Sequence, residues 1–208
     1  MEQEQPKIID ANSIITQDNK LYHEFVECIS SALDARDPYT GDHSRRVSDT
    51  ATVLAKMLGL ADDEIQEIHI AAHLHDIGKI AVPDAVLNKP SRLTDGEYEL
   101  MKKHTIWGKE ILAGLEFLPQ ADMGAAYHHE RFDGKGYPYG IKGDKIPDIV
   151  RIISAADSLD AMSSNRCYRR HCDKDYIISE FEKGAGTQFD ADVAQVVVEL
   201  IKEGRIIL

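Results

Sequence analysis

Apolar residues recur every three or four positions along most of the chain, which is the spacing of one face of an amphipathic α-helix. A first run at four-residue spacing consists of Leu21, Phe25, Ile29 and Leu33. A second run consists of Val47, Ala51, Leu54 and Leu58, and Gly59 follows it as a helix stop. No stretch that alternates apolar and polar residues is longer than about four residues. The pattern therefore predicts an all-α fold, a bundle of helices.

One segment cannot be regular structure. Residues 131–140 read RFDGKGYPYG and hold three glycines and a proline. We expect this glycine-rich loop to be held by the residues that it surrounds. Helical patterns flank the loop on both sides, so residues 20–208 are predicted to form one domain. Residues 1–19 are polar without a sustained period and are interpreted as a tail or a linker.

Composition narrows the class of protein. The 208 residues are 43% hydrophobic, which is enough for a real core, and carry a net charge of −12. An acidic surface repels phosphates, so we expect no polymeric nucleic acid as a partner. No apolar run is long enough for a membrane span, no leader precedes the domain, and the three cysteines lack a C-x-x-C spacing. The expected location is the cytoplasm, with no membrane partner.

Candidate chemistry begins at His75-Asp76, where an apolar helix is about to stop at Gly78. Ile68, Ala71 and Ala72 precede His75 at helical spacing, so His75 is predicted to face the core. A buried carboxylate beside it needs a cation or several donors. The pair is therefore interpreted as metal ligands. His69 and His73 lie roughly opposite His75 on the helical wheel and are interpreted as solvated or capping residues.

Other predicted helices also carry residues of metal-binding type that are predicted to face the core. They are His43, His104, His128, His129 and Asp157. Single buried histidines often only form hydrogen bonds in a core, but five imidazoles and two carboxylates fit two metal ions that share a bridging carboxylate. Two divalent ions about 3.5–4 Å apart would polarise a bridging water to hydroxide for attack on a phosphoryl group. Iron or manganese is the first choice, with zinc or nickel as alternatives.

These residues resemble the metal-dependent HD phosphohydrolases, whose motif H…HD…D stands here as His43, His75-Asp76 and Asp157. The chain is most similar to the HD-GYP subfamily, which adds the later histidines, an H-D-I-G-K segment and a loop reading H-H-E-R-x-D-G-x-G-Y-P. The resemblance covers about residues 21 to 200. It implies a bacterial second-messenger hydrolase that converts cyclic di-GMP to linear pGpG and, in some members, on to GMP.

The resemblance also implies roles for individual residues. One metal would be held by His43, His75, Asp76 and Asp157. The other would be held by His104, His128 and His129, with Asp76 bridging. Lys79 matches a lysine that contacts the scissile phosphate, and a cation there would stabilise charge on the phosphorane. Arg166 and Arg169 match a basic pair that holds the ligand, and Tyr137 either stacks on a base or packs the loop. Tyr39 stands where members proposed to bind a third metal have glutamate, so two metals are expected.

Two alternative functions remain open in the sequence. The substrate could be another nucleotide phosphoester such as cyclic GMP-AMP, because nothing shows how the purine is recognised. The domain could instead be a non-catalytic module that binds a ligand or a partner, although the complete ligand set argues against this. The sequence also leaves open a homodimer and a sensory or receiver domain ahead of residue 1.

Overall fold

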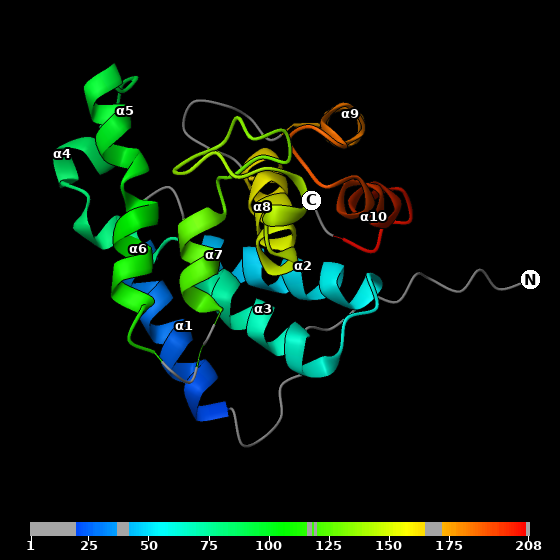
Figure 1. The fold of residues 1–208 in the computed structure, drawn as a ribbon, viewed down its shortest axis with the longest axis horizontal. Coiled ribbons are helices and arrows are strands. Elements are labelled where there is room, and N and C mark those ends of the chain that lie inside the picture. The colour runs from blue at the N-terminus through cyan, green and yellow to red at the C-terminus, as the bar shows by residue number, and fades with distance from the viewer. Residues whose placement is uncertain (1–19, 37–41, 116–117, 119, 165–171, 207–208) are drawn as a thin grey trace, which may run out of the picture.

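The computed structural model describes residues 20–36, 42–115, 118, 120–164 and 172–206. Within these ranges the chain is helical and contains no β-strand, so the predicted all-α fold is confirmed (Figure 1). The one sheet-like contact in them is an isolated bridge between Ala185 and Phe189. The predicted tail at residues 1–19 lies outside the described residues.

Helices α2 (His43–Met57) and α3 (Asp62–Leu74) run antiparallel to each other and form the centre of the bundle (Figure 1). Gly59 between them has a φ of 80°, a backbone conformation that favours glycine. Helix α1 (Lys20–Asp34) and helix α7 (Ala121–Tyr127) each pack against α3, while α8 (Asp148–Ser163) packs against α2. Every residue of α3 from Ile68 to Leu74 is buried, so this helix has no solvated face over its last two turns.

The segment after α3 carries the chain past the site. A 3₁₀ turn, η3 (Ile77–Ala81), leads to the short α4 (Asp84–Leu87), then to α5 (Asp95–Lys102) and α6 (His104–Leu112). A capping box at Thr94 begins α5, and Lys103 separates α5 from α6, so His104 is the first residue of the second helix.

The C-terminal part closes the bundle at the end opposite α5 (Figure 1). A second 3₁₀ turn, η4 (Gly143–Lys145), precedes α8, and helices α9 (Lys174–Gly184) and α10 (Ala191–Lys202) follow it. The carboxylates of Asp173 and Asp190 accept hydrogen bonds from backbone amides in the first turns of α9 and α10. Both residues are therefore N-caps of their helices.

Two predictions about buried faces are wrong. Phe25 is 65% exposed, whereas Leu33 of the same run is buried as predicted, and so is Val26, which lies outside the run. A strict four-residue spacing drifts by about 40° per step around a helix, so the outer end of such a run leaves the buried face. His69 and His73, interpreted as solvated, are only 4% and 2% exposed. They are buried because α1 and α2 cover the side of α3 that lies away from His75.

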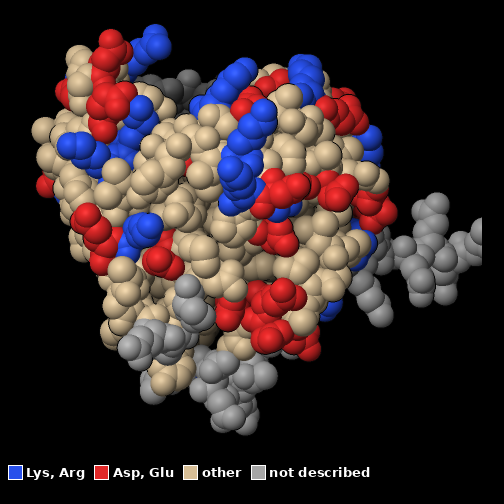
Figure 2. All heavy atoms as spheres, viewed as in Figure 1, with Lys and Arg blue, Asp and Glu red and all other residues tan. Residues whose placement is uncertain are grey.

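The surface mixes charges of both signs. On the face shown in Figure 2, basic and acidic side chains are interspersed, and neither sign covers the face alone. Among the described helices, none is long and apolar enough to cross a membrane.

Candidate metal centre

The centre is built around the C-terminal end of α3. His75 follows the helix and Asp76 begins the turn into η3, and they are 0% and 5% exposed. The Nδ1 of His75 donates a hydrogen bond to the carbonyl oxygen of Ala72 at 2.6 Å. This bond holds a proton on Nδ1 and turns Nε2 toward the ligand group, so Nε2 is the nitrogen that can bind a metal. The buried Nε2 has no hydrogen-bond partner among the described residues.

Two further imidazoles are held in the same way. The Nδ1 of His104 lies 2.8 Å from the carbonyl oxygen of Met101, and the Nδ1 of His128 lies 3.1 Å from that of Gly124. Their Nε2 atoms point at one another across 3.2 Å. The ring of His129 packs beside both, with centroids 5.2 Å from His104 and 4.1 Å from His128. Three imidazoles from α6 and the end of α7 therefore converge on one point.

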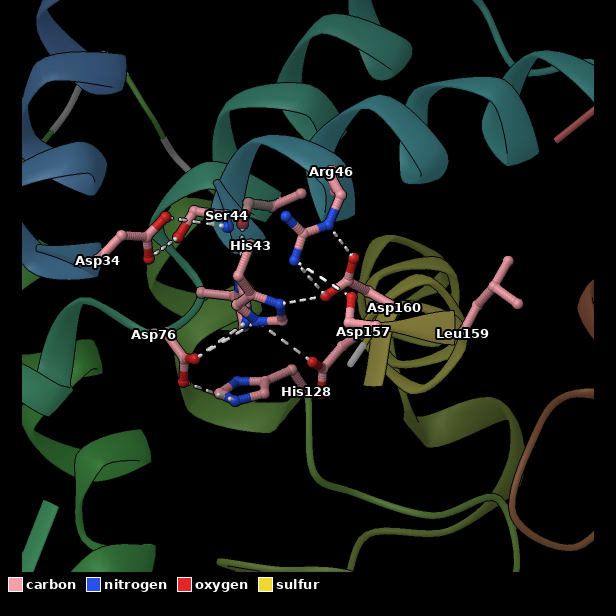
Figure 3. Close-up of polar contacts among 12 residues, drawn as sticks. Asp34, His43, Ser44, Arg46, Asp76, His128, Asp157, Leu159 and Asp160 are labelled. Carbon is pink, nitrogen blue, oxygen red and sulfur yellow. Dashed lines mark hydrogen bonds and ion pairs between the residues drawn. The ribbon is translucent and has the colours of Figure 1, made fainter. Parts of the chain in front are cut away.

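On the other side, α2 and α8 supply His43 and Asp157 (Figure 3). The Nε2 of His43 lies 3.5 Å from Asp157 Oδ1 and 3.8 Å from Asp76 Oδ2. Its Nδ1 bonds to Asp160 Oδ2 at 2.7 Å, and Arg46 Nε donates to Asp160 Oδ1 at 2.5 Å. Asp160 thus orients His43 from behind, as carboxylates commonly do for metal-bound histidines.

The ligand atoms fall into groups that fit two metal ions. The nitrogens of His104, His128 and His129 lie within 4.8 Å of one another, and the same limit holds for His43, His75 and Asp157. Asp76 lies between the groups. Its Oδ1 is 3.4 Å from His104 Nε2, and its Oδ2 is 3.4 Å from His75 Nε2. Imidazole nitrogens and carboxylate oxygens are suitable ligands for divalent transition metals, so the residues present fit the predicted ions.

Electrostatics favours the ligand forms of most of these side chains. Burial lowers the pKa of His129 to about 4 and lowers the pKa of His104 and His128 as well. Burial alone would raise the pKa of Asp76, but the nearby Lys79 and His75 hold this pKa well below its usual range. For His75 burial also disfavours the charged form, yet the Asp76 carboxylate raises its pKa to about 9. A metal bound at His75 would therefore displace a proton.

The glycine-rich loop closes one side of the centre, as expected of a segment held by its surroundings. The carboxylate of Glu130 accepts hydrogen bonds from the amides of Tyr139 and Gly140 at 2.7 and 3.0 Å. A Cβ at Gly136 would lie 2.4 Å from the backbone nitrogen of Arg131, so no larger residue fits there. The Tyr137 ring packs on His129 with centroids 4.7 Å apart. The loop thus places Tyr137 beside the metal ligands.

The structure brings together nearly all the residues predicted for the site. The seven predicted ligands converge, and the Lys79 Nζ lies 2.6 Å from Asp76 Oδ2. Arg166, Arg169 and Tyr39 lie outside the described residues. Asp160 and Arg46 are contributors for which the sequence analysis gave no role. A signal existed for Asp160, because it follows Asp157 by three residues and so lies on the same side of α8.

Comparison with known proteins places this centre in a family. The family model described as HD domain matches residues 27–193, and the chain belongs to this family. The chain is 40% identical over 169 residues to the cyclic di-GMP phosphodiesterase response regulator RpfG of Xanthomonas campestris, covering 80% of this chain and 45% of that protein. It is 37% identical over 178 residues to the 3'3'-cGAMP-specific phosphodiesterase 2 of Vibrio cholerae, covering 85% and 34%. The chain thus spans less than half the length of either relative.

A solved structure supports the fold. The structure described as a cyclic GMP-AMP-specific phosphodiesterase of Vibrio cholerae matches with a TM-score of 0.68 and 20% identity over 88% of this chain and 49% of that one. At this identity the match shows the HD-type helical fold alone.

Removing the carboxylate behind His43 should weaken metal binding. We expect Asp160→Ala to lower metal affinity by roughly 10–100-fold, because His43 loses the acceptor that fixes its ring and its proton. Asp160→Asn keeps an acceptor oxygen and should retain most of the affinity. Competition with a chelator, monitored as metal left on the protein, would measure both. Equal metal affinity in Asp160→Ala and the wild type would show that Asp160 does not position His43.

Proposed function

We propose that this chain is a metal-dependent phosphodiesterase that hydrolyses a cyclic dinucleotide, with cyclic di-GMP as the substrate and linear pGpG as the first product. The observation that carries the proposal is the presence of two ligand groups with one shared carboxylate, Asp76, between them. Relatives named as cyclic di-GMP and cGAMP phosphodiesterases support the substrate class.

The proposed ligand sets follow the two groups. His43, His75, Asp76 and Asp157 hold one divalent ion, and His104, His128, His129 and Asp76 hold the other. Iron or manganese is our first choice, since mixed imidazole and carboxylate ligands accept both. When bound, two such ions supply Lewis-acid stabilisation of the phosphate and an activated water.

The chain's own residues supply position and charge. Four of the five imidazoles, those of His43, His75, His104 and His128, are oriented by a hydrogen-bond acceptor behind the ring, so most of the ligand set is organised before substrate arrives. Water then attacks phosphorus on the side opposite the ribose 3′ oxygen. The bond between phosphorus and the 3′ oxygen breaks, and this oxygen leaves as a hydroxyl by taking the proton that the attacking water loses. Lys79 is placed beside Asp76 to stabilise the negative charge that develops on the phosphoryl oxygens.

Substrate contacts outside the metal ligands complete the proposal. Tyr137 packs on His129 and lies where it can contact the substrate next to the second ligand group. Arg166 and Arg169 are proposed to bind the ligand's phosphates or guanine through charge-assisted hydrogen bonds.

A substrate panel tests the proposal. The protein is loaded with Fe²⁺ or Mn²⁺ and incubated with cyclic di-GMP, 3'3'-cGAMP and cyclic di-AMP, and products are separated by chromatography. We expect pGpG from cyclic di-GMP, and the same traces show whether GMP follows. Faster hydrolysis of 3'3'-cGAMP would favour the second candidate substrate, which the 37% identical relative supports. No hydrolysis by protein carrying two ions per chain would favour a non-catalytic binding module.

Lys79 should act on turnover more than on binding. We expect Lys79→Ala to lower kcat by roughly 10²–10³-fold with a smaller change in KM, as for loss of one oxyanion donor. Lys56→Ala, an exposed lysine of α2, serves as the control. Steady-state kinetics on samples with equal metal content would measure the effect. Unchanged kcat with a raised KM would instead assign Lys79 to substrate binding.

A further inference from the structure

A second histidine cluster, His23, His69 and His73, lies between α1 and α3 and shares no residue with the candidate metal centre. One ring nitrogen from each lies within 4.8 Å of the others. The rings of His23 and His69 are stacked with centroids 4.9 Å apart, and His73 meets His69 edge-on at 4.9 Å. Three imidazoles therefore face one point on the side of α3 away from His75.

The hydroxyls of α2 determine which nitrogen of His69 carries its proton. Ser48 Oγ donates its hydrogen to the carbonyl oxygen of His69, and Thr52 Oγ1 donates its hydrogen to that of Ser48. Each hydroxyl has one hydrogen, so both accept from His69 Nδ1, at 2.8 and 2.9 Å. The proton is thus on Nδ1, and the lone pair on Nε2 accepts a hydrogen bond from His23 Nε2. Burial, with His23 nearby, lowers the pKa of His69 to about 4, so the ring is neutral at pH 7.

The Nε2 lone pair of His69 points at His23. The two Nε2 atoms are 2.8 Å apart. Two imidazole nitrogens bound to one tetrahedral Zn²⁺ lie about 3.3 Å apart, given bonds of about 2.0–2.1 Å. The His104 and His128 Nε2 atoms of the candidate metal centre are 3.2 Å apart, a similar arrangement. Behind His23, Glu27 Oε2 lies 3.7 Å from Nδ1, where a carboxylate can orient a metal-bound ring.

His73 supplies the observation that hydrogen bonding does not explain. Its side chain is buried, yet neither ring nitrogen has a hydrogen-bond partner among the described residues. Unsatisfied buried polar atoms are rare because they lose their hydration without compensation. His73 also lines an open pocket together with Glu27 and Asp34. The pocket gives access to His73 from solvent.

We infer that His23, His69 and His73 form a third metal site, which holds a zinc-class divalent ion and fastens α1 to α3. Three neutral imidazoles with one open position are a known zinc ligand set. The ion would give a ring nitrogen of His73 a partner and replace the hydrogen bond between His23 and His69. Because the site lies outside the candidate catalytic residues, its role is to stabilise the bundle.

Counting zinc ions tests the site. Asp76→Ala is expected to lower the metal content of the candidate metal centre, so it serves as the background for the comparison. After equilibration with Zn²⁺ and dialysis, we expect one zinc ion per chain fewer in Asp76→Ala/His23→Gln than in Asp76→Ala. Adding Glu24→Gln, an exposed change on the same helix, should leave the count unchanged. Equal counts with and without His23→Gln would overturn the site.

A second readout does not depend on the Asp76 background. In the otherwise native chain, His23→Gln should hold one zinc ion fewer than the wild type and gain less in Tm from added Zn²⁺, while turnover of the loaded enzyme is kept. His73→Phe fills the same space without a ligand atom and should match it. If zinc raises the Tm of the wild type and His23→Gln equally, the three histidines only pack against one another.

Discussion

Replacing Asp76 by alanine should abolish hydrolysis and remove metal from both ligand groups. Asp76 is placed between the groups, with Oδ1 3.7 Å from His128 Nε2 and Oδ2 3.8 Å from His43 Nε2. Each group therefore loses a ligand in one substitution. We expect turnover to fall by more than about 10³-fold, beyond the loss of a single oxyanion donor.

Metal content separates the explanations for lost activity. Elemental analysis of Asp76→Ala should show loss of ions from both groups, whereas Asp144→Ala, an exposed carboxylate in η4, should behave as the wild type. Far-ultraviolet circular dichroism would establish that the variant is folded. An Asp76→Ala protein that keeps the wild-type metal content and near-normal turnover would refute the bridging role.

Much of the candidate site is predictable because its ligands follow the apolar period of their own helices. His43 lies four residues before Val47, and both are buried in α2. Asp157 lies four residues after Ile153 on α8. Such spacing requires only knowledge of one helix and one buried face. The resemblance to HD phosphohydrolases then supplied the grouping of ligands, which spacing alone does not give.

Contacts between helices were not predictable in this way. The wheel of α3 places His69 and His73 away from His75, but it does not show that α1 and α2 cover that side as well. The role of Asp160 depends on the approach of α8 to His43 in α2, 117 residues away in sequence. The apolar period of one helix does not show which other helices contact it. These contacts are seen only in the packed structure.

Among glycine-to-alanine substitutions near the site, Gly78→Ala should lower stability and metal binding the most. At Gly78 the backbone of η3 packs directly on α6, and an added Cβ would lie 1.8 Å from the carbonyl oxygen of His104 and 2.5 Å from the amide nitrogen of Gly108. Both atoms belong to a helix backbone, which cannot move aside as a flexible side chain can. The methyl group must therefore push η3 away from α6.

This displacement should affect stability and metal binding together. Overpacking costs about 1–3 kcal/mol, which corresponds to a fall in Tm of roughly 2–12 °C for a chain of this size. Because His104 begins α6 and His75-Asp76 precedes η3, the same shift separates ligands of the two groups and should lower metal content. Gly96→Ala is the matched control, since a Cβ there has no atom within 4 Å. That change in α5 should be neutral or stabilise by up to about 1 kcal/mol. Thermal unfolding and elemental analysis of both variants would measure the contrast, and a Gly78→Ala protein as stable and as metal-rich as Gly96→Ala would show that η3 and α6 are not held in this close contact.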